Sequence, residues 1–504
     1  MTSLQPAHLL PLTGENPSGE AVWTPTASLS WSDLEVRARR LARALNDHGL
    51  TPGHRWAVLA HNRIEWPEFL LGNARAGTKL TPLNWHLTAR ELSELLVDSG
   101  ATLVVVDEAL EEIGRRAARS AGLAAEAVVV LGSPYESWLA EADDDLLPDW
   151  DMGSALLYTG GTTGRSKGVT RSDTSGPVSR WYQRGSAWGG QARLPEEGVG
   201  LVTTPMYHSL AQGFVAAALT RRHTLSILPR FDPEATLAVI EERAVTATPM
   251  VPTQFIRMLK LDEQVRAGHD LSSLRWVLHT AAPCPPWVKR AMIDWFGPVI
   301  FELYGSSEGT GPVICSSQEW LEHPGTVGRA STALTLSIVD DKGRDLPPGE
   351  IGTIYVKRHD GAPEYHGDPE KTAAGRLPDG RFTVGDLGWL DEEGFLYLAD
   401  RRVDLIITGG SNVYPAEIEG VLSEHPEVAD VAVFGIPDEE FGQQIKAVVE
   451  PAPGTDPDPD EILEFARERL AGYKVPRSLD LIDRLPREAH GKLKKRLLRD
   501  PYWA

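Results

Sequence analysis

The chain has 504 residues. At roughly 100–200 residues per domain, this length predicts two to four domains rather than a single core. A hydrophobic content of 41% and a charged fraction of 24% are ordinary for a soluble globular protein. The net charge of −21 argues against nucleic acid as a main partner, because binding a polyanion needs clustered Lys and Arg. Only two cysteines occur, which excludes a disulfide framework and a Cys-based zinc site.

The start of the chain, Met1 to Leu12, has no basic segment followed by a long apolar one, so we expect no signal peptide. No window approaches the roughly 20 apolar residues that span a bilayer. We therefore expect a cytoplasmic protein without a membrane span. The sequence leaves the oligomeric state open, and a homodimer is compatible with it.

The first part of the chain alternates helix and strand patterns. Ser32-Asp33-Leu34-Glu35 is predicted to be a capping box, and apolar residues then recur at helical spacing as far as Gly49. The patterns that follow predict strands at 56–60, 103–106 and 128–131, and helices at 65–76 and 88–99. Helices alternating with almost wholly apolar strands predict α/β layers around parallel sheets.

The later part of the chain has two further features. Residues 338–356, interrupted by Gly343 and by Pro347-Pro348-Gly349, predict a small antiparallel unit. A boundary is expected near Asp404, because the chain beyond it has its own helices and strands. These are predicted at 415–425, 428–434, 445–449 and 461–470. We therefore predict an N-terminal domain, 1–402, and a separate C-terminal domain, 403–504.

The strongest local motif is Tyr158-Thr159-Gly160-Gly161-Thr162-Thr163-Gly164-Arg165-Ser166-Lys167-Gly168, which follows a short strand pattern. Glycines let a backbone turn tightly and point its N–H groups at an anion, while hydroxyls and a lysine add donors and charge. This composition suits polyphosphate binding. It is not the Walker A pattern, because two residues separate Gly164 from Lys167. A plain Gly/Thr surface loop is the alternative.

Three weaker clusters follow, namely Tyr304-Gly305-Ser306-Ser307-Glu308-Gly309, Gly385-Asp386 with Asp400-Arg401, and Pro486 to Lys492. The first offers an aromatic face, hydroxyls and a carboxylate of the kind that binds Mg²⁺ on a nucleotide. The second offers an acid for ribose hydroxyls and an arginine for phosphate or sugar oxygens. Taken singly, such clusters are more often a plain turn, a surface ion pair and a solvated basic face.

In this order and spacing, the clusters resemble the motifs of the adenylate-forming superfamily, which includes acyl-CoA synthetases, firefly luciferase and peptide-synthetase adenylation domains. The resemblance covers nearly the whole chain. Further matching strings are Pro205-Met206-Tyr207-His208, Ala281-Ala282-Pro283, Pro324 to Arg329 and Asp404 to Glu419. It implies an α/β fold with a large N-terminal domain of layered α/β sheets and a small β-barrel-like unit, which holds the ATP and acid sites. A small, mobile α+β C-terminal domain would close over it, hinged near Asp404.

The resemblance also implies ATP, Mg²⁺ and coenzyme A as co-substrates and cofactors. The residues it assigns to the nucleotide are Thr159, Gly160, Gly161, Thr162, Thr163, Gly164, Lys167, Ala281, Ala282, Pro283, Glu302, Leu303, Tyr304, Gly305, Ser306, Ser307, Asp386, Arg401 and Lys492. Within this set the loop from Thr159 to Lys167 would hold the β- and γ-phosphates. Tyr304 and the 281–283 backbone would enclose adenine, Ser307 would bond the α-phosphate, and Asp386 with Arg401 would hold the ribose.

The catalytic residues implied are Lys492, Glu308, His208 and Thr163, with Glu308 as the metal ligand. A substrate carboxylate must attack an α-phosphate that is already anionic. A lysine and Mg²⁺ between the two offset the repulsion and stabilise the transition state. Gly409 and Gly410 would line the tunnel for coenzyme A. The phosphate loop departs from many relatives in having Gly160 for Ser and Ser166 for Pro, and Ser307 replaces Thr, but none of these changes removes an essential group.

The acceptor and the acid are less fully specified. The strings 406–415 and 82–88 resemble those of fatty-acyl and aryl-acid CoA ligases, which favours coenzyme A as acceptor. The alternative is a stand-alone adenylating enzyme that serves a carrier protein, an amine or another nitrogen nucleophile, as in natural-product biosynthesis. A degenerate binding module is a third possibility, against which the intact Lys492 and Glu308 argue. The substrate pocket implied by the resemblance includes His208, Phe214, Thr253, His279 and Leu303. These favour an aromatic or medium-length carboxylic acid and leave a long chain open.

Overall fold

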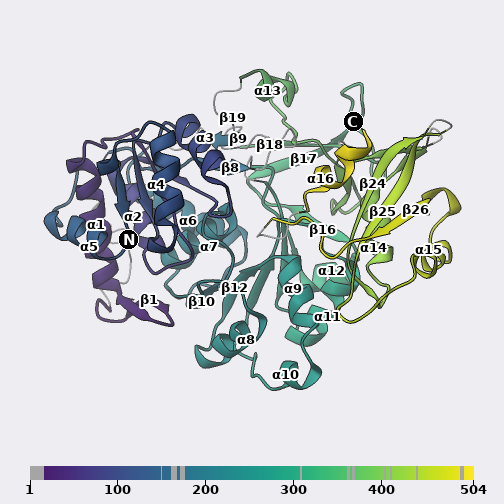
Figure 1. The fold of residues 1–504 in the computed structure, drawn as a ribbon, viewed down its shortest axis with the longest axis horizontal. Coiled ribbons are helices and arrows are strands. Elements are labelled where there is room, and N and C mark those ends of the chain that lie inside the picture. Colours follow the sequence, from purple (N-terminus) through teal and green to yellow (C-terminus); the bar gives the residue numbers. More distant parts are fainter. Residues whose placement is uncertain are drawn as a thin grey trace.

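The computed structural model describes residues 16–148, 150–159, 167–170, 176–306, 309–359, 364–365, 369–401, 404–408, 411–438, 441–488 and 493–503. A large N-terminal domain contains two main β-sheets with their helices, and a smaller domain follows at the C-terminal end (Figure 1). The expected α/β architecture is confirmed.

The first sheet is five-stranded and parallel, in the order β6-β5-β3-β4-β7. Its strands are β3 (Arg55–Leu59), β4 (Lys79–Pro82), β5 (Leu103–Val106), β6 (Val128–Val130) and β7 (Ser154–Ala155). Its helices are α1 (Trp31–Asp47), α2 (Trp66–Ala76), α3 (Ala89–Ser99), α4 (Glu111–Ser120) and α5 (Ser133–Glu141). All four residues of β5 are buried, as expected for a strand with both faces covered. The strands and helices predicted here are confirmed to within one residue, apart from the start of α1.

The start of α1 corrects the predicted capping box. The N-cap is Ser30, whose hydroxyl accepts a hydrogen bond from the Asp33 backbone N–H at 3.1 Å. The Asp33 carboxylate in turn accepts from the Ser30 N–H at 3.2 Å. Aspartate completes this reciprocal pair as Glu does in the usual motif, so the helix begins earlier than the pattern at Ser32 predicts.

The second sheet is thirteen-stranded, in the order β17-β18-β20-β21-β16-β15-β14-β13-β12-β10-β11-β1-β2. Neighbouring strands from β1 through β11, β10, β12 and β13 to β14 run parallel. These strands are β1 (Glu20–Thr24), β10 (Gly198–Val202), β11 (His223–Ile227), β12 (Ala247–Met250), β13 (Trp276–His279) and β14 (Ile300–Tyr304), with β2 (Ala27–Ser30) at the edge. The helices are α6 (Ser179–Gln191), α7 (Ser209–Thr220), α8 (Pro233–Glu242), α9 (Pro252–Leu259), α10 (Glu263–Ala267), α11 (Pro286–Phe296) and α12 (Ser317–Glu322).

Two hydrophobic cores lie on the two faces of this sheet. Trp276 and Leu278 belong to one core and Val277 to the other, because successive side chains of a strand point to opposite faces. Figure 1 shows α6 and α7 next to the first sheet, and α9 and α11 on the side of the small domain. The sheet therefore separates two environments, one shared with the first sheet and one facing the C-terminal end.

The far end of this sheet is the predicted antiparallel unit. It consists of β15 (Val313–Ser316), β16 (Thr326–Ala330), β17 (Leu334–Val339), β18 (Gly352–Arg358), β20 (Asp386–Leu390) and β21 (Leu396–Arg401). A small core of its own includes Val327, Ile338 and Ile354. A separate three-stranded sheet, β19-β9-β8, contains β8 (Leu157–Thr159), β9 (Lys167–Thr170) and β19 (Glu364–Tyr365), and α13 (Pro369–Ala374) lies nearby.

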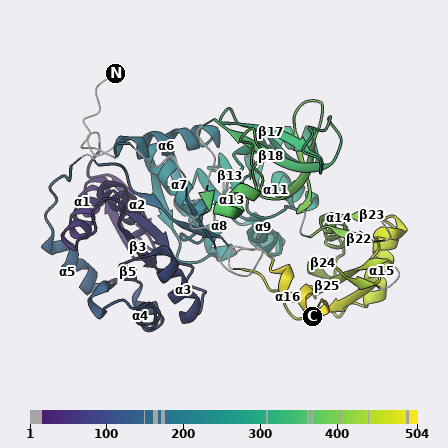
Figure 2. The ribbon, with the colours of Figure 1, turned by 90° about the horizontal axis from the view of Figure 1, so that it is seen from above.

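The small domain has its own sheet and core. Its elements are β22 (Ile406–Thr408), β23 (Ser411–Val413), α14 (Pro415–Leu422), β24 (Val428–Asp438), β25 (Gly442–Pro451), α15 (Pro459–Arg467), β26 (Ser478–Leu481) and α16 (Lys495–Arg499). Ile418, Val433 and Ile462 pack in one cluster. Figure 2 shows this domain beside the large one, with α16 on the side that faces it. Among the helices described, none is long and apolar enough to cross a membrane.

Candidate active site

The predicted phosphate loop connects two paired strands. β8 and β9 are antiparallel, with Thr159 opposite Lys167. The two ends of the loop are therefore adjacent, as a loop that encloses an anion requires. The residues between them, Gly160, Gly161, Thr162, Thr163 and Gly164 among them, lie outside the described part of the chain.

A tyrosine fixes the strand that enters this loop. The Tyr158 hydroxyl donates a hydrogen bond of 2.5 Å to the carboxylate of Asp98 at the end of α3. Burial, together with this hydrogen bond to a negative charge, raises the pKa of Tyr158 above its usual value. The phenol is therefore neutral at physiological pH and acts as a donor that links the phosphate hairpin to the first sheet.

The three residues predicted to surround the nucleoside come together. Tyr304, at the end of β14, donates a hydrogen bond of 2.7 Å from its hydroxyl to the buried carboxylate of Asp386. Asp386 begins β20 and lies opposite Arg401 in the register of β20 with β21. The bond fixes the orientation of the Tyr304 ring. An aromatic face and a carboxylate thus share one corner of the site.

The loop after Tyr304 folds back on itself. A side chain at Gly305 would meet the Gly311 Cα at 3.1 Å, and one at Gly311 would meet the Tyr304 carbonyl oxygen at 2.5 Å. Arg358 donates hydrogen bonds to the carbonyl oxygens of Gly309 and Gly311. Ser306 accepts one from the Thr310 hydroxyl at 3.2 Å. The loop is thus fixed on both sides of Ser307 and Glu308, which lie outside the described residues.

The predicted adenine-binding backbone follows β13. Ala281 has φ of 76°, in the left-handed region that favours glycine, and a non-glycine residue held there costs about 1 kcal/mol or more. Ala281 and Pro283 are exposed, and Ala282 is half-buried. Strained backbone concentrates at functional sites. This exposed, strained segment is therefore compatible with a surface that a ligand covers.

Side chains from α11, β14 and β13 form a buried ionic cluster. The Lys289 ammonium of α11 donates a hydrogen bond of 2.5 Å to Glu302, and His279 Nε2 lies 3.7 Å from the same carboxylate. Lys289 and His279 are fully buried. Burial lowers the pKa of His279 to about 4, with Glu302 raising it and Lys289 lowering it. The histidine is therefore neutral at physiological pH, and Glu302, predicted as a nucleotide residue, directs its carboxylate to Lys289.

The predicted acyl-pocket residues divide between the two faces of the sheet. Phe214 of α7 stacks on Trp276 at 5.7 Å and is fully buried in the core shared with the first sheet. Leu303 packs against the same core. His279 faces the opposite side, where its ring meets Phe255 at 5.4 Å. Thr253 of α9 is half-buried. Phe214 and Leu303 therefore belong to the core on one face of the sheet, whereas His279 lies on the opposite face.

His208 forms the N-terminal boundary of α7. Its ring lies 4.2 Å from that of Tyr207, which makes an edge contact with Trp85 at 6.4 Å. Trp85 also contacts His86 at 3.5 Å. These rings form a surface between the first sheet and α7.

The segment that contains Lys492 approaches this surface. Arg487 and Leu493 pair as an antiparallel bridge. Burial and the charge of Glu488 raise the pKa of Tyr207. Burial, His61 and Lys494 lower the pKa of His86. Glu488 and Lys494, which lie on either side of Lys492 in the chain, therefore act on the rings next to His208. Lys492 itself lies outside the described residues.

The hinge region and the tunnel are partly described. Asp404 lies 3.8 Å from Arg499 of α16, while Gly409 and Gly410 lie outside the described residues. The Trp287 indole N–H donates to the Ser423 hydroxyl at 3.2 Å, which joins α11 to the small domain. Within the described ranges, no three His, Cys, Asp or Glu side chains are grouped to hold a metal ion.

Tyr304 with Asp386, the paired strands β8 and β9, and a second domain are arranged as expected for an adenylate-forming ligase. The AMP-binding enzyme family matches residues 13–366, and the AMP-binding enzyme C-terminal domain matches residues 417–492. The chain belongs to this family, in the adenylate-forming superfamily.

Two curated relatives match almost end to end. The feruloyl-CoA synthase of Amycolatopsis sp is 35% identical over 487 residues, which cover 95% of this chain and 95% of the relative. The fatty acid–[acyl-carrier-protein] ligase ScoC of Streptomyces coeruleorubidus is 32% identical over 499 residues, which cover 97% and 94%. The chain is therefore similar both to a CoA ligase and to a carrier-protein ligase.

Among solved structures, ATP-bound MatB from Rhodopseudomonas palustris is 30% identical, with a TM-score of 0.84 over 97% of this chain and 96% of that one. Apo MatB, with the same identity and coverage, gives 0.71. The structure of this chain is therefore more similar to ATP-bound MatB than to apo MatB.

Proposed function

We propose that this protein uses ATP to convert a carboxylic acid into its acyl-adenylate, with release of pyrophosphate, and then transfers the acyl group to coenzyme A. The observation that carries the proposal is the position of Glu488 and Lys494, on either side of Lys492 in the chain, whose charges act on Tyr207 and His86. This position supports entry of Lys492 beside His208 in the first half-reaction.

In that step an oxygen of the substrate carboxylate attacks the α-phosphorus of ATP, and the bond from this phosphorus to the β-bridging oxygen breaks. Both reacting groups are anionic. The ammonium of Lys492 would lie between them and stabilise the charge that develops in the transition state. Lysine is permanently charged at physiological pH, so no proton transfer is needed for this role.

The remaining residues would bind and orient the nucleotide. Tyr304, fixed by its hydrogen bond to Asp386, would stack on adenine, and Asp386 with Arg401 would bind the ribose. The loop between Thr159 and Lys167 would enclose the β- and γ-phosphates. Glu308 has the oxygen ligand that Mg²⁺ prefers, and the ion would neutralise phosphate charge when bound.

For the second step the small domain would rotate about a hinge at Asp404, with residues 403–504 moving against 1–402. This would withdraw Lys492 and bring Gly409 and Gly410 to the path of the thiol. The thiolate of coenzyme A would attack the acyl carbon, and AMP would leave. The similarity to ATP-bound MatB supports the view that the present arrangement belongs to the first step.

The acid is proposed to be aromatic or of medium length. The stack of Phe214 on Trp276 and the side chain of Leu303 belong to one apolar, aromatic-rich core, which supports an apolar acid. The feruloyl-CoA synthase relative supports an aromatic acid. A free carrier protein is the second candidate acceptor, which the similarity to ScoC favours. We further propose a cytoplasmic location, where ATP and coenzyme A are supplied, whereas a homodimer stays a prediction.

The variant Lys492→Ala tests the assignment. It should abolish pyrophosphate release but leave thioester formation from supplied acyl-adenylate largely intact. Arg496→Ala, which removes a positive charge from the exposed surface of α16, is the matched control and should leave both reactions unchanged. Equal loss of both half-reactions in Lys492→Ala would refute the role given to this lysine.

A further inference from the structure

One buried side chain of the first sheet bonds to the backbone of the second. Asn62 follows β3, and its amide nitrogen donates to the carbonyl oxygens of Thr204 at 3.0 Å and Leu228 at 3.2 Å. Its amide oxygen accepts from the Met206 N–H at 2.8 Å. These partners lie 142, 166 and 144 residues away in sequence. Only an amide has donors and an acceptor to meet all three at once.

The partners of Asn62 lie at the carboxyl ends of two parallel strands. Thr204 follows β10 and Leu228 follows β11, and the two strands are neighbours. Met206 lies in the short connection from β10 to His208 and is fully buried. Asn62 therefore bonds the connection at the point where it leaves the sheet, two residues before His208.

The same connection is bonded from the other side. The Gln212 side-chain amide, on the first turn of α7, donates to the Met206 carbonyl oxygen at 3.0 Å. The backbone N–H and carbonyl oxygen of Met206 thus both bond to buried side-chain amides, one from Asn62 after β3 and one from Gln212 on α7. The following turn is closed by a hydrogen bond of 3.1 Å from the His208 N–H to the Pro205 carbonyl oxygen. This leaves the backbone little freedom to move His208.

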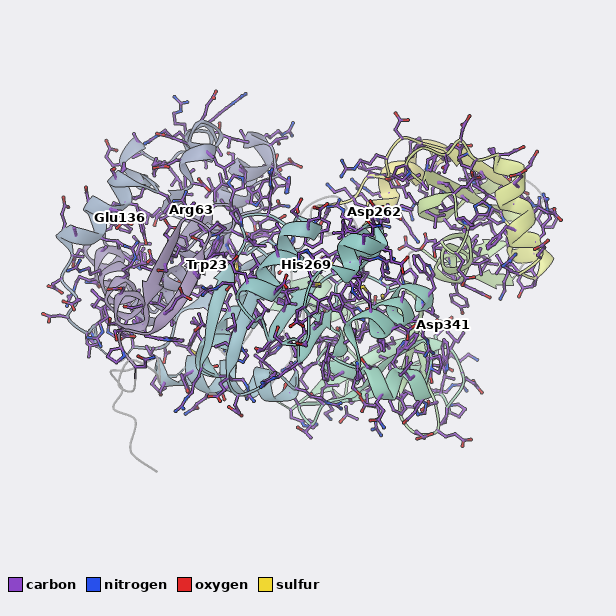
Figure 3. All side chains as sticks on the ribbon, turned by 90° about the horizontal axis from the view of Figure 1, so that it is seen from below. Trp23, Arg63, Glu136, Asp262, His269 and Asp341 are labelled. Atoms are coloured by element: carbon purple, nitrogen blue, oxygen red, sulfur yellow. The ribbon has the colours of Figure 1, made fainter. Side chains whose placement is uncertain are left out.

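Asn62 is itself fixed in place. The neighbouring His61 and Arg63 both bond to Asp107, at 2.9 Å and 3.0 Å, and the Trp66 indole donates to the His61 carbonyl oxygen. Figure 3 labels Arg63 on the N-terminal part of the ribbon. Because hydrogen bonds fix the residues on both sides of Asn62, its amide holds the backbone of residues 204–206 in one position.

We propose that Asn62 and Gln212 are positioning residues of the adenylation step, which act by fixing the connection that carries His208. The inference rests on the proposed function and goes beyond it, because that function assigns a role to neither residue. A displacement of about 1 Å far from the chemistry is enough to lower a rate about 100-fold.

The test uses Asn62→Leu and Gln212→Met, which keep side-chain size and remove the hydrogen bonds. The matched control is Thr246→Val. Its hydroxyl bonds the Val199 N–H and carbonyl oxygen, at 3.0 Å and 3.2 Å, at the opposite end of β10. Each is combined with His208→Ala, and pyrophosphate release is measured with the best acid at saturating ATP, alongside the ATP KM and the thermal midpoint.

Asn62→Leu and Gln212→Met should each lower kcat about 10- to 100-fold, leave the ATP KM within about twofold, and cause no further loss in the His208→Ala background. Thr246→Val should keep the wild-type kcat despite a comparable fall in thermal midpoint. A kcat within about twofold of wild type, or an equal further loss without His208, would overturn the proposal. If Asn62→Leu does not fold, Gln212→Met decides the question alone. Absence of pyrophosphate release from the wild type would instead refute the proposed function.

Discussion

Replacing Lys289 by Met leaves the buried carboxylate of Glu302 without its positively charged partner. The ammonium lies 2.5 Å from Glu302, with side-chain exposures of 1% and 11%. At an effective dielectric constant of about 20, two charges at this distance attract by about 7 kcal/mol. The desolvation of the two ions costs several kcal/mol each, so the intact pair contributes little net stability. Removing the lysine alone leaves the carboxylate buried and uncompensated, which costs about 3–5 kcal/mol.

The measurement is thermal unfolding of Lys289→Met, Glu302→Gln and the double variant. We expect Lys289→Met to lower the midpoint by on the order of 3–6 °C, and the double variant to recover most of the loss. Arg90→Ala, in an exposed pair on α3 with side-chain exposures of 89% and 49%, is the control and should lose well under about 1 kcal/mol. If the thermal midpoint of Lys289→Met lies within about 1–2 °C of wild type, the buried Glu302 carboxylate does not depend on Lys289.

The pH dependence makes this test sharper. Because His279 has a folded pKa of about 4 against an ordinary value of 6.5, the unfolded chain takes up its proton first. The stability from this neutral histidine is therefore complete above pH 6.5 and is lost as the pH falls toward 4. In Lys289→Met the ammonium that lowers the pKa of His279 is gone, and a protonated imidazole can neutralise Glu302. The loss of stability in Lys289→Met should thus be smaller at about pH 5.5 than at about pH 8.

Three further outcomes follow from the site and the core. Burial raises the pKa of Glu319, but hydrogen bonds from Arg193 and the α12 cap lower it to about 2. The stability that the Glu319 carboxylate contributes is therefore present above pH 4.5 and lost as the pH falls toward 2. Glu319→Gln should flatten this part of the acid-unfolding profile. Tyr304→Phe keeps the ring but removes the bond to Asp386, so the ATP KM should rise about fivefold, the equivalent of about 1 kcal/mol. Asp386→Ala should raise it further, and an unchanged ATP KM in steady-state kinetics would contradict the ribose contact.

The elements predicted from the sequence were those with strong local patterns. A run such as Leu103-Val104-Val105-Val106 is short and rich in β-branched residues, which favours a buried strand, and the structure confirms it. Local signals also explain the errors. The predicted cap, Ser32, lies within α1, and the cap is Ser30, because the Asp33 side chain completes the reciprocal pair with it. In the small domain, α15 begins at Pro459 because Asp458 caps it, two residues before the predicted start.

The site was predictable where function acts through contiguous motifs. Tyr304, Asp386 and Arg401 were expected together, and the structure brings them together. By contrast, no local pattern marks Lys289 or Asn62. The partner of Lys289 on α11 is Glu302 on β14, 13 residues later. The partners of Asn62 are at least 142 residues later. Such pairings are properties of the assembled sheets, and a single sequence does not contain them.

Adenylation and transfer to coenzyme A are tested together by pyrophosphate release across a panel of aromatic and aliphatic acids, with and without coenzyme A, and with mass spectrometry of the products. We expect turnover that requires coenzyme A and yields an acyl-CoA thioester, fastest with aromatic or medium-length acids. Pyrophosphate release with accumulating acyl-adenylate and no thioester would contradict coenzyme A as acceptor and favour a carrier protein. No pyrophosphate release with any acid would contradict the adenylation itself.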